Sequence, residues 1–72
     1  MIKIGGKYRH FKGMECRVLG IARDCETLED MVIYLELNDG TVWVRPAKNW
    51  SDQIVRPGVN APRFTEIKDD AE

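Results

Sequence analysis

The stretch GKYRHFKG, residues 6–13, concentrates chemically versatile side chains near the start of the chain. Between two glycines it holds two aromatic residues, three cations and His10, the only histidine in the sequence. This composition suits contact with a negatively charged partner, acid–base catalysis by the imidazole, or packing in an ordinary first strand. A histidine among aromatic residues is more often a hydrogen-bonded packing residue than an acid or a base. The stretch by itself therefore does not define a function.

Other groups that could perform catalysis or bind metal are few. Cys16 and Cys25 are too few for a disulfide framework and are expected to be reduced, with Cys16 as a small core hydrophobe. A metal site needs about three or four ligands, and no Cys-x-x-Cys or His-x-x-x-His spacing supports one built from His10, Cys16, Asp24 and Cys25. Attack by Cys25 with His10 as base lacks a group that orients the histidine and an oxyanion hole. The sequence predicts no catalytic residue, no metal and no cofactor, and it leaves enzymatic activity uncertain.

Residues 31–46, MVIYLELNDGTVWVRP, predict a β-hairpin with Asp39-Gly40 as a two-residue turn. This turn pairs Glu36 with Trp43 and Tyr34 with Arg45. The strands then have an apolar face expected toward the core (Ile33, Leu35, Leu37, Val42 and Val44) and a second face expected toward solvent (Tyr34, Glu36, Trp43 and Arg45). Outward aromatic residues are either covered by a neighbouring segment or form a recognition platform, and Arg45 suits a cation–π contact or a carboxylate or phosphate.

Strand alternation divides the first stretch between two faces. Tyr8 and His10 share one face, and Arg9 and Phe11 share the other. Only one of these pairs can join the tryptophan-bearing face of the hairpin. If Phe11 is in the core, Tyr8 and His10 face outward; if Tyr8 is in the core, Arg9 becomes available beside Arg45.

Short elements must position these residues, because glycine and proline divide the chain into pieces too brief for long helices. In addition to the hairpin at 31–46, we expect strands at 7–11, 15–22 with a bulge at Gly20, 53–55 and 63–67. We also expect a polar connection after the second strand, where Asp24 or Thr27 caps a turn. A short helical turn anchored by Trp50 should follow Pro46, with a loop at 56–62 and Phe64 facing inward. The pattern predicts an all-β fold, a small five- to six-stranded SH3-like partly open barrel with one short helical turn. The domain is expected to span residues 1–68, with a frayed acidic tail at 69–72.

Composition excludes several classes of protein. With 43% hydrophobic and 32% charged residues, the chain is typical of a globular protein, and it has no apolar run of the roughly 20 residues that span a bilayer. No secretory signal is apparent, so a cytoplasmic location is expected. Residues 1–23 carry six cations and one acid, whereas residues 24–44 carry six acids and no cation. This segregation predicts strand pairing across opposite charges and disfavours a strong nucleic-acid binder.

Five motifs occur in a fixed order: GKYRHFKG, VLGIAR, ETLEDMVIY, WVRP and PRF. On these motifs, over about residues 5–64, the chain resembles a family of short bacterial proteins known as domain of unknown function 1653. The resemblance implies no established activity. The residues that fit the family pattern are Tyr8, Arg9, His10, Phe11, Lys12, Gly13, Glu26, Thr27, Tyr34, Trp43, Val44, Arg45, Pro46, Arg63 and Phe64. Cys16, Asp24 and Trp50 depart from it, which counts against a site built on Cys16 or Asp24.

We expect a binding or adaptor module whose aromatic and arginine-bearing surface recognises an unknown protein, a peptide or an anionic ligand. The candidate site residues are Tyr8, Arg9, His10, Glu26, Thr27, Tyr34, Trp43 and Arg45. Glu26 with Thr27 either caps the following turn or forms an ion pair with Arg9 or Arg45. The alternative is a small barrel that binds single-stranded nucleic acid by stacking and phosphate contacts, and the third hypothesis is a small hydrolase using His10. We expect no membrane association, and a monomer or a weak dimer formed through an exposed barrel edge.

Overall fold

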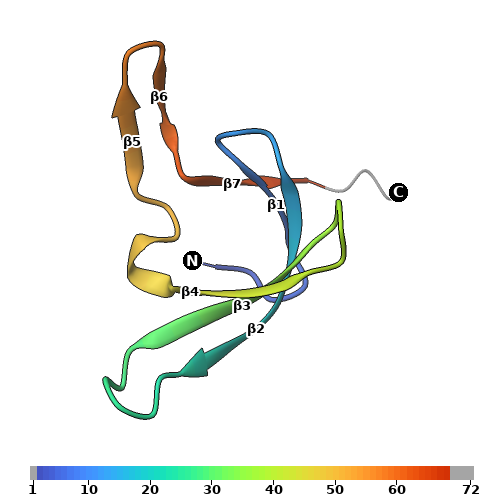
Figure 1. Ribbon diagram of the computed structural model, residues 1–72, viewed down its shortest axis with the longest axis vertical. Helices are drawn as coiled ribbons and strands as arrows, with labels where there is room; N and C mark the ends of the chain where they lie inside the picture. Colours follow the sequence, from blue (N-terminus) through green and yellow to red (C-terminus); the bar gives the residue numbers. More distant parts are fainter. Residues whose placement is uncertain (1, 69–72) are drawn as a thin grey trace.

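The computed structural model describes residues 2–68, and the expected frayed tail at 69–72 lies outside the described residues. Its elements are β1 (Lys7–His10), β2 (Glu15–Arg23), β3 (Asp30–Glu36), β4 (Val42–Pro46), η1 (Ala47–Asn49), β5 (Gln53–Arg56), β6 (Val59–Pro62) and β7 (Phe64–Ile67). Five antiparallel strands form a curled sheet in the order β4-β3-β2-β1-β7. The β5–β6 hairpin projects away from this sheet (Figure 1, orange).

The all-β class with one short helical turn is confirmed, and the open arrangement of the sheets is compatible with an SH3-like partly open barrel. Residues 2–68 form seven strands, instead of the five or six that were expected. The difference arises at residues 59–62, which were expected to be loop but pair with β5 as strand β6. Within residues 2–68, no helix is long and apolar enough to cross a membrane.

A tight turn and a bulge shape the first two strands. The N–H of His10 donates to the carbonyl of Met14 at 2.7 Å, which closes the turn between β1 and β2. Gly13 in this turn has φ of 104°, a conformation that side chains disfavour. The register of β2 against β3 shifts between Val18 and Gly20, which confirms the bulge predicted at this glycine. A bulge bends a strand and increases its twist, and this long strand lies where the sheet curls.

The predicted hairpin forms as β3–β4, but its register differs by two residues from the prediction. Tyr34 lies opposite Trp43, so the expected pairing of Tyr34 with Arg45 is wrong. The connection is a loop of residues 37–40 instead of the two-residue Asp39-Gly40 turn. Because the shift is even, the alternation between faces is preserved.

Local hydrogen bonds explain the longer loop. The N–H of Gly40 donates to the carbonyl of Glu36 at 2.9 Å, and the N–H of Glu36 donates to the carbonyl of Thr41 at 2.8 Å. The Asp39 carboxylate accepts the N–H of Thr41 at 2.9 Å. Aspartate side chains commonly bond the backbone two residues ahead in this way, so Asp39 stabilises a wider turn than the one predicted.

The faces of this hairpin were assigned to the wrong sides. Val32, which alternates with Tyr34, is completely buried, and Tyr34 is half-buried on the same concave face. On the opposite face Val42 and Val44 are 56% and 58% exposed. The cause lies outside the hairpin: Trp50, from the segment after η1, covers the concave face. Alternation within a strand does not reveal which face the rest of the chain covers.

Three aromatic residues, Tyr8, Trp50 and Phe64, belong to the buried core. Trp50 is 1% exposed, and its ring stacks on Phe64 with the centroids 3.9 Å apart and the planes inclined by 6°. Tyr8 and Tyr34 meet the same indole edge-on, at 5.4 Å and 5.1 Å. Cys16 is buried among them. The predictions of Trp50 as an anchor, Phe64 as inward-facing and Cys16 as a core residue are therefore confirmed.

The acidic segment forms ion pairs with cations on both sides of it in the sequence. Arg23 Nε lies 3.6 Å from Asp30 Oδ1, and Lys48 Nζ lies 2.8 Å from Glu29 Oε2. The predicted strand pairing across opposite charges is confirmed for Arg23 and Asp30, which lie opposite each other on β2 and β3. The pair of Lys48 and Glu29 joins η1 to the β2–β3 loop and is not a strand pair. Both pairs lie at the surface, where such contacts contribute little stability.

We predict that Trp50→Ala reduces the free energy of unfolding by about 3–5 kcal/mol, because it removes the stacked ring and leaves a cavity. In a domain of this size that loss approaches the total stability. Trp50→Phe, which keeps an aromatic ring, is expected to cost about 1–3 kcal/mol. The matched control is Trp43→Ala, expected to cost less than about 1 kcal/mol because Trp43 is 49% exposed. Urea denaturation followed by circular dichroism measures these differences; equal losses at the two tryptophans would contradict the prediction.

Candidate functional site

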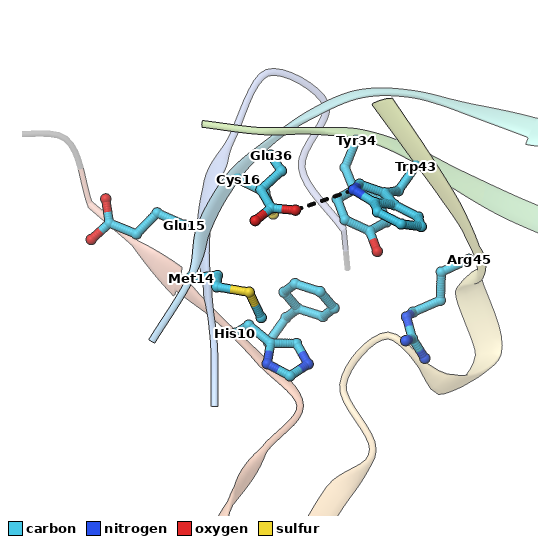
Figure 2. A pocket seen from close by; sticks show the side chains of 9 residues that line it. His10, Met14, Glu15, Cys16, Tyr34, Glu36, Trp43 and Arg45 are labelled. Carbon is cyan, nitrogen blue, oxygen red and sulfur yellow. Dashed lines mark hydrogen bonds between the residues drawn. The ribbon is translucent and has the colours of Figure 1, made fainter. Parts of the chain in front are cut away.

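A cavity of about 280 Å³ opens on the concave face of the curled sheet (Figure 2). Each of the five strands contributes to it: His10 from β1, Glu15 and Cys16 from β2, Tyr34 and Glu36 from β3, Trp43 and Arg45 from β4, and Phe64 from β7, with Met14 from the β1–β2 turn. Small-molecule sites typically measure about 300–1,000 Å³. The cavity therefore suits a group the size of one side chain or a small organic acid.

The wall of the cavity is aromatic. The ring of Phe64 meets Tyr34 edge-on at 5.6 Å and His10 edge-on at 5.0 Å. Trp43 is about half exposed, and its indole N–H donates to Glu36 Oε1 at 3.2 Å (Figure 2). The Tyr34 hydroxyl points into the cavity (Figure 2). A ligand in the cavity would meet ring surfaces together with a few polar groups.

Arg45 brings a positive charge to the cavity with few partners. Its Nη1 lies 3.5 Å from Asn49 Oδ1, at the limit of a hydrogen bond. Its Nε is buried and has no hydrogen-bond partner within residues 2–68. Nor does its guanidinium form an ion pair with any carboxylate of that part of the chain. A guanidinium has five N–H donors, and residues 2–68 provide acceptors for few of those of Arg45.

His10 is neutral in this setting. Its Nδ1 accepts the backbone N–H of Lys12 at 3.1 Å, which places the proton of the neutral ring on Nε2. Burial lowers the pKa of His10 below its usual value, and the positive charges of Arg45, Arg63 and Lys12 lower this pKa further. The imidazole therefore acts as an uncharged donor at neutral pH.

The carboxylates lie at another part of the lining. Burial, followed by the negative charge of Glu36, raises the pKa of the Cys16 thiol to about 11. Glu15 is held by Arg9 at 2.8 Å and by Lys7 at 3.4 Å, and these hydrogen bonds keep the pKa of its carboxyl below the usual value. Within residues 2–68, Glu36 is the lining carboxylate without a cationic partner, and it lies near Cys16. The cavity is therefore polarised between the positive charge of Arg45 and the negative charge of Glu36.

Four of the eight residues predicted for the site line this cavity: His10, Tyr34, Trp43 and Arg45. They come from three strands and converge on one concave surface (Figure 2). The sequence left open whether Arg9 or His10 shares the face of Trp43 and Arg45, and the structure places His10 there.

Tyr8 and Arg9 lie outside the cavity. Tyr8 is on the concave face but belongs to the core, 5% exposed, and its hydroxyl accepts the N–H of Lys3 at 3.0 Å. The expectation that a buried Tyr8 would bring Arg9 beside Arg45 is wrong. It assumed that Trp43 and Arg45 face away from the core, whereas both lie on the same concave face as Tyr8. Arg9 is on the other face of β1.

Glu26 and Thr27 are exposed in the loop between β2 and β3. Their backbone N–H groups donate to Asp24 Oδ1 at 2.8 Å and 3.2 Å, so Asp24 caps the turn as expected. The ion pair of Glu26 with Arg9 or Arg45, one of two alternatives, is absent among residues 2–68. These two residues stabilise the loop and do not line the cavity.

The remaining lining residues were not among the predicted site residues. Strand alternation already placed Glu36 on the same face as Trp43, so Glu36 could have been included among the candidate site residues. Phe64 was expected to face inward, but only the position of β7 beside β1 brings it next to His10. Cys16 reaches the cavity from the start of β2, and Met14 reaches it from the β1–β2 turn. The sequence predicts a turn between the first two strands but not the direction in which its side chains point.

Comparisons with known proteins agree with the resemblance seen in the sequence. The model of a family described as "Protein of unknown function (DUF1653)" matches residues 6–66. A crystal structure of a DUF1653 protein from Bordetella bronchiseptica is similar, with a TM-score of 0.78 and 32% identity over 88% of this chain and 85% of that chain. No curated protein matches the sequence. The predicted membership is confirmed, and it comes without an assigned activity.

We predict that Arg45→Gln raises the pKa of His10 toward its usual value, because a nearby positive charge disfavours the imidazolium. We expect the pKa of His10 to remain below its usual value in this variant, since burial is the larger cause of the lowered pKa. Arg23→Gln is the matched control, because Arg23 pairs with Asp30 and does not line the cavity. As His10 is the only histidine, its Cε1–H proton resonance gives the titration directly. An unchanged pKa in Arg45→Gln would show that the arginine does not act on the imidazole.

Proposed function

We propose that this chain, which belongs to the DUF1653 family of proteins of unknown function, is a binding module that holds a carboxylate-bearing group in its concave cavity. The observation that carries the proposal is the guanidinium of Arg45, which has a buried Nε without a partner among residues 2–68 and one weak contact to Asn49. Leaving a buried donor unpaired costs about 1–3 kcal/mol, and more for charged groups. A carboxylate that accepts hydrogen bonds from this group would offset part of that cost.

The charges around the cavity favour a single carboxylate over a phosphate or a chain of phosphates. Arg45, Arg63 and Lys12 act on His10, and they give this part of the cavity a positive potential. Glu36, near Cys16, opposes any second negative charge. A planar carboxylate also matches the fork of a guanidinium with two parallel hydrogen bonds.

The aromatic wall supports a ligand that has an apolar body beside its carboxylate. The rings of Tyr34, Trp43 and Phe64 line the cavity, and aromatic contacts of this kind add to the burial of apolar area. The Tyr34 hydroxyl and the Nε2–H of His10 are available as neutral donors. Neutral donors fix the orientation of a ligand without a large cost of desolvation.

The same cavity supports binding better than hydrolysis. Hydrolysis through a covalent intermediate would need a protein nucleophile beside His10. Cys16 lines the cavity, but its pKa of about 11 keeps it a thiol at neutral pH, and the thiolate is the reactive form. Cys25 lies on the β2–β3 loop, away from the lining residues. A binding role requires none of these groups to react.

A cytoplasmic location is part of the proposal. It is supported by the cysteine chemistry, since Cys16 and Cys25 are both free thiols. Free thiols are usual in reducing compartments.

We predict that 3-phenylpropionate binds in the cavity, because its ring fits the aromatic wall and its carboxylate reaches Arg45. Binding should raise the pKa of His10, since an anion nearby favours the imidazolium. Arg45→Gln is expected to weaken binding about 10- to 100-fold, as loss of a hydrogen bond to a charged group costs about 1.5–3 kcal/mol. Arg45→Lys keeps the positive charge but cannot donate two parallel hydrogen bonds to a carboxylate. We therefore expect its affinity to lie between those of the wild type and Arg45→Gln. Nuclear magnetic resonance titration of the backbone amides measures these affinities.

Two controls make this test specific. The amide 3-phenylpropanamide has the same ring without the charge and should bind more weakly than the acid. Arg23→Gln removes a cation remote from the cavity and should leave the affinity unchanged. If the acid and the amide bind equally, or if Arg45→Gln binds as the wild type does, the proposed carboxylate site is wrong.

The nucleic-acid alternative makes a separate prediction. A thymidine oligonucleotide that contacts several phosphates would bind at low salt and lose affinity steeply as salt increases. We expect no such binding, because Glu36 faces the cavity beside Trp43, the ring available for stacking. Fluorescence anisotropy at low and physiological salt measures it. Tight, salt-sensitive binding that Trp43→Ala abolishes would favour the alternative.

A further inference from the structure

Strand β4 is an edge of the five-stranded sheet and pairs only with β3 within residues 2–68. Val42, Trp43 and Val44 are 56%, 49% and 58% exposed in succession. Natural proteins usually protect such edges with proline, lysine, a bulge or a covering segment. Pro46 ends this strand, but Val42–Arg45 contain no proline or lysine, and their pairing with β3 has no bulge. The exposed strand is therefore able to accept another strand.

The free backbone groups of this edge can be identified. Glu36 and Thr41 form a hydrogen-bonded pair across the hairpin. Hydrogen-bonded and non-hydrogen-bonded pairs alternate in an antiparallel ladder, so Trp43 and Arg45 direct their backbone groups toward β3. Val42 and Val44 then direct their N–H and C=O groups away from the sheet.

The cavity lies directly on the concave side of this edge. Trp43 and Arg45, the two β4 side chains on that face, both line it. A strand added to β4 would place alternate side chains about 4.5–5.5 Å from their opposite partners and about 7–8 Å from the diagonal ones. A glutamate opposite Trp43 would therefore reach the guanidinium of Arg45.

We propose that the partner of this module is an extended peptide segment that adds to β4 as a further antiparallel strand and places one acidic side chain in the cavity. The inference rests on the proposed carboxylate site and adds the class of partner that carries the carboxylate. Backbone hydrogen bonds to Val42 and Val44 supply affinity without regard to sequence, and the cavity selects the acidic residue. On the convex face, apolar residues on either side of the acid extend the exposed valine pair.

A second copy of the chain complements this edge less well than such a peptide. Antiparallel pairing of two β4 strands about Trp43 would place the two indoles opposite each other. Strand β4, Val42–Pro46, contains no carboxylate, so the pairing would bring no acid to Arg45. The charge of the cavity therefore favours an acidic peptide.

The test uses the blocked pentapeptide TVEVT, acetylated and amidated, with its glutamate opposite Trp43 and its valines opposite Val42 and Val44. We expect chemical shift changes and slowed hydrogen exchange at the amides of Val42 and Val44, together with a raised pKa of His10. The same peptide with both valine nitrogens methylated keeps the side chains but loses the backbone donors. It should bind at least about tenfold more weakly, since each lost hydrogen bond costs about 1 kcal/mol.

Each outcome discriminates between the two proposals. If 3-phenylpropionate binds but TVEVT leaves the amides of Val42 and Val44 unchanged, strand addition is wrong and the carboxylate site stands. If neither binds, both proposals fail. Equal affinity of the methylated and unmethylated peptides would overturn strand addition. A concentration-dependent dimer in sedimentation velocity that TVEVT does not dissociate would also overturn it, because the edge would then belong to a second copy.

Discussion

The stack of Trp50 on Phe64 is the contact on which the rest of the molecule depends. Trp50 follows η1, beyond the edge strand β4, and Phe64 begins the opposite edge strand β7, so their contact draws the two edges of one sheet together. The sheet must curl for these rings to meet, and the curl creates the concave face. Tyr34 meets both rings edge-on and also lines the cavity. The same aromatic cluster thus forms the core and the floor of the candidate site.

The local parts of this fold could be predicted from the sequence. The bulge at Gly20, the turn anchored by Trp50 and the inward Phe64 all follow from residue type and immediate neighbours. The register of the β3–β4 hairpin could not be predicted from the sequence. The Asp39-Gly40 pair is compatible both with a two-residue turn and with a longer loop that the Asp39 side chain closes. The choice between them depends on contacts made by the strands.

The covered face of the hairpin depends on sequence far from it. Val42 and Val44 look like core residues in a strand pattern, yet they are exposed. The half-polar face is the buried one, because Trp50 brings a large apolar surface to it. The same limit applies to the site. His10 and Arg45 were found by residue type, but their meeting with Phe64 depends on the strand order.

The rate at which Cys16 is labelled by a thiol reagent measures how often the fold opens. The residue is 3% exposed, and its thiol, with a pKa of about 11, is almost entirely protonated at neutral pH. Thiol reagents therefore reach it and react with it only when the sheet opens. Cys25 is exposed and reacts without any opening. The ratio of the two labelling rates therefore reports the population of open molecules in native buffer, in a chain that needs no introduced probe.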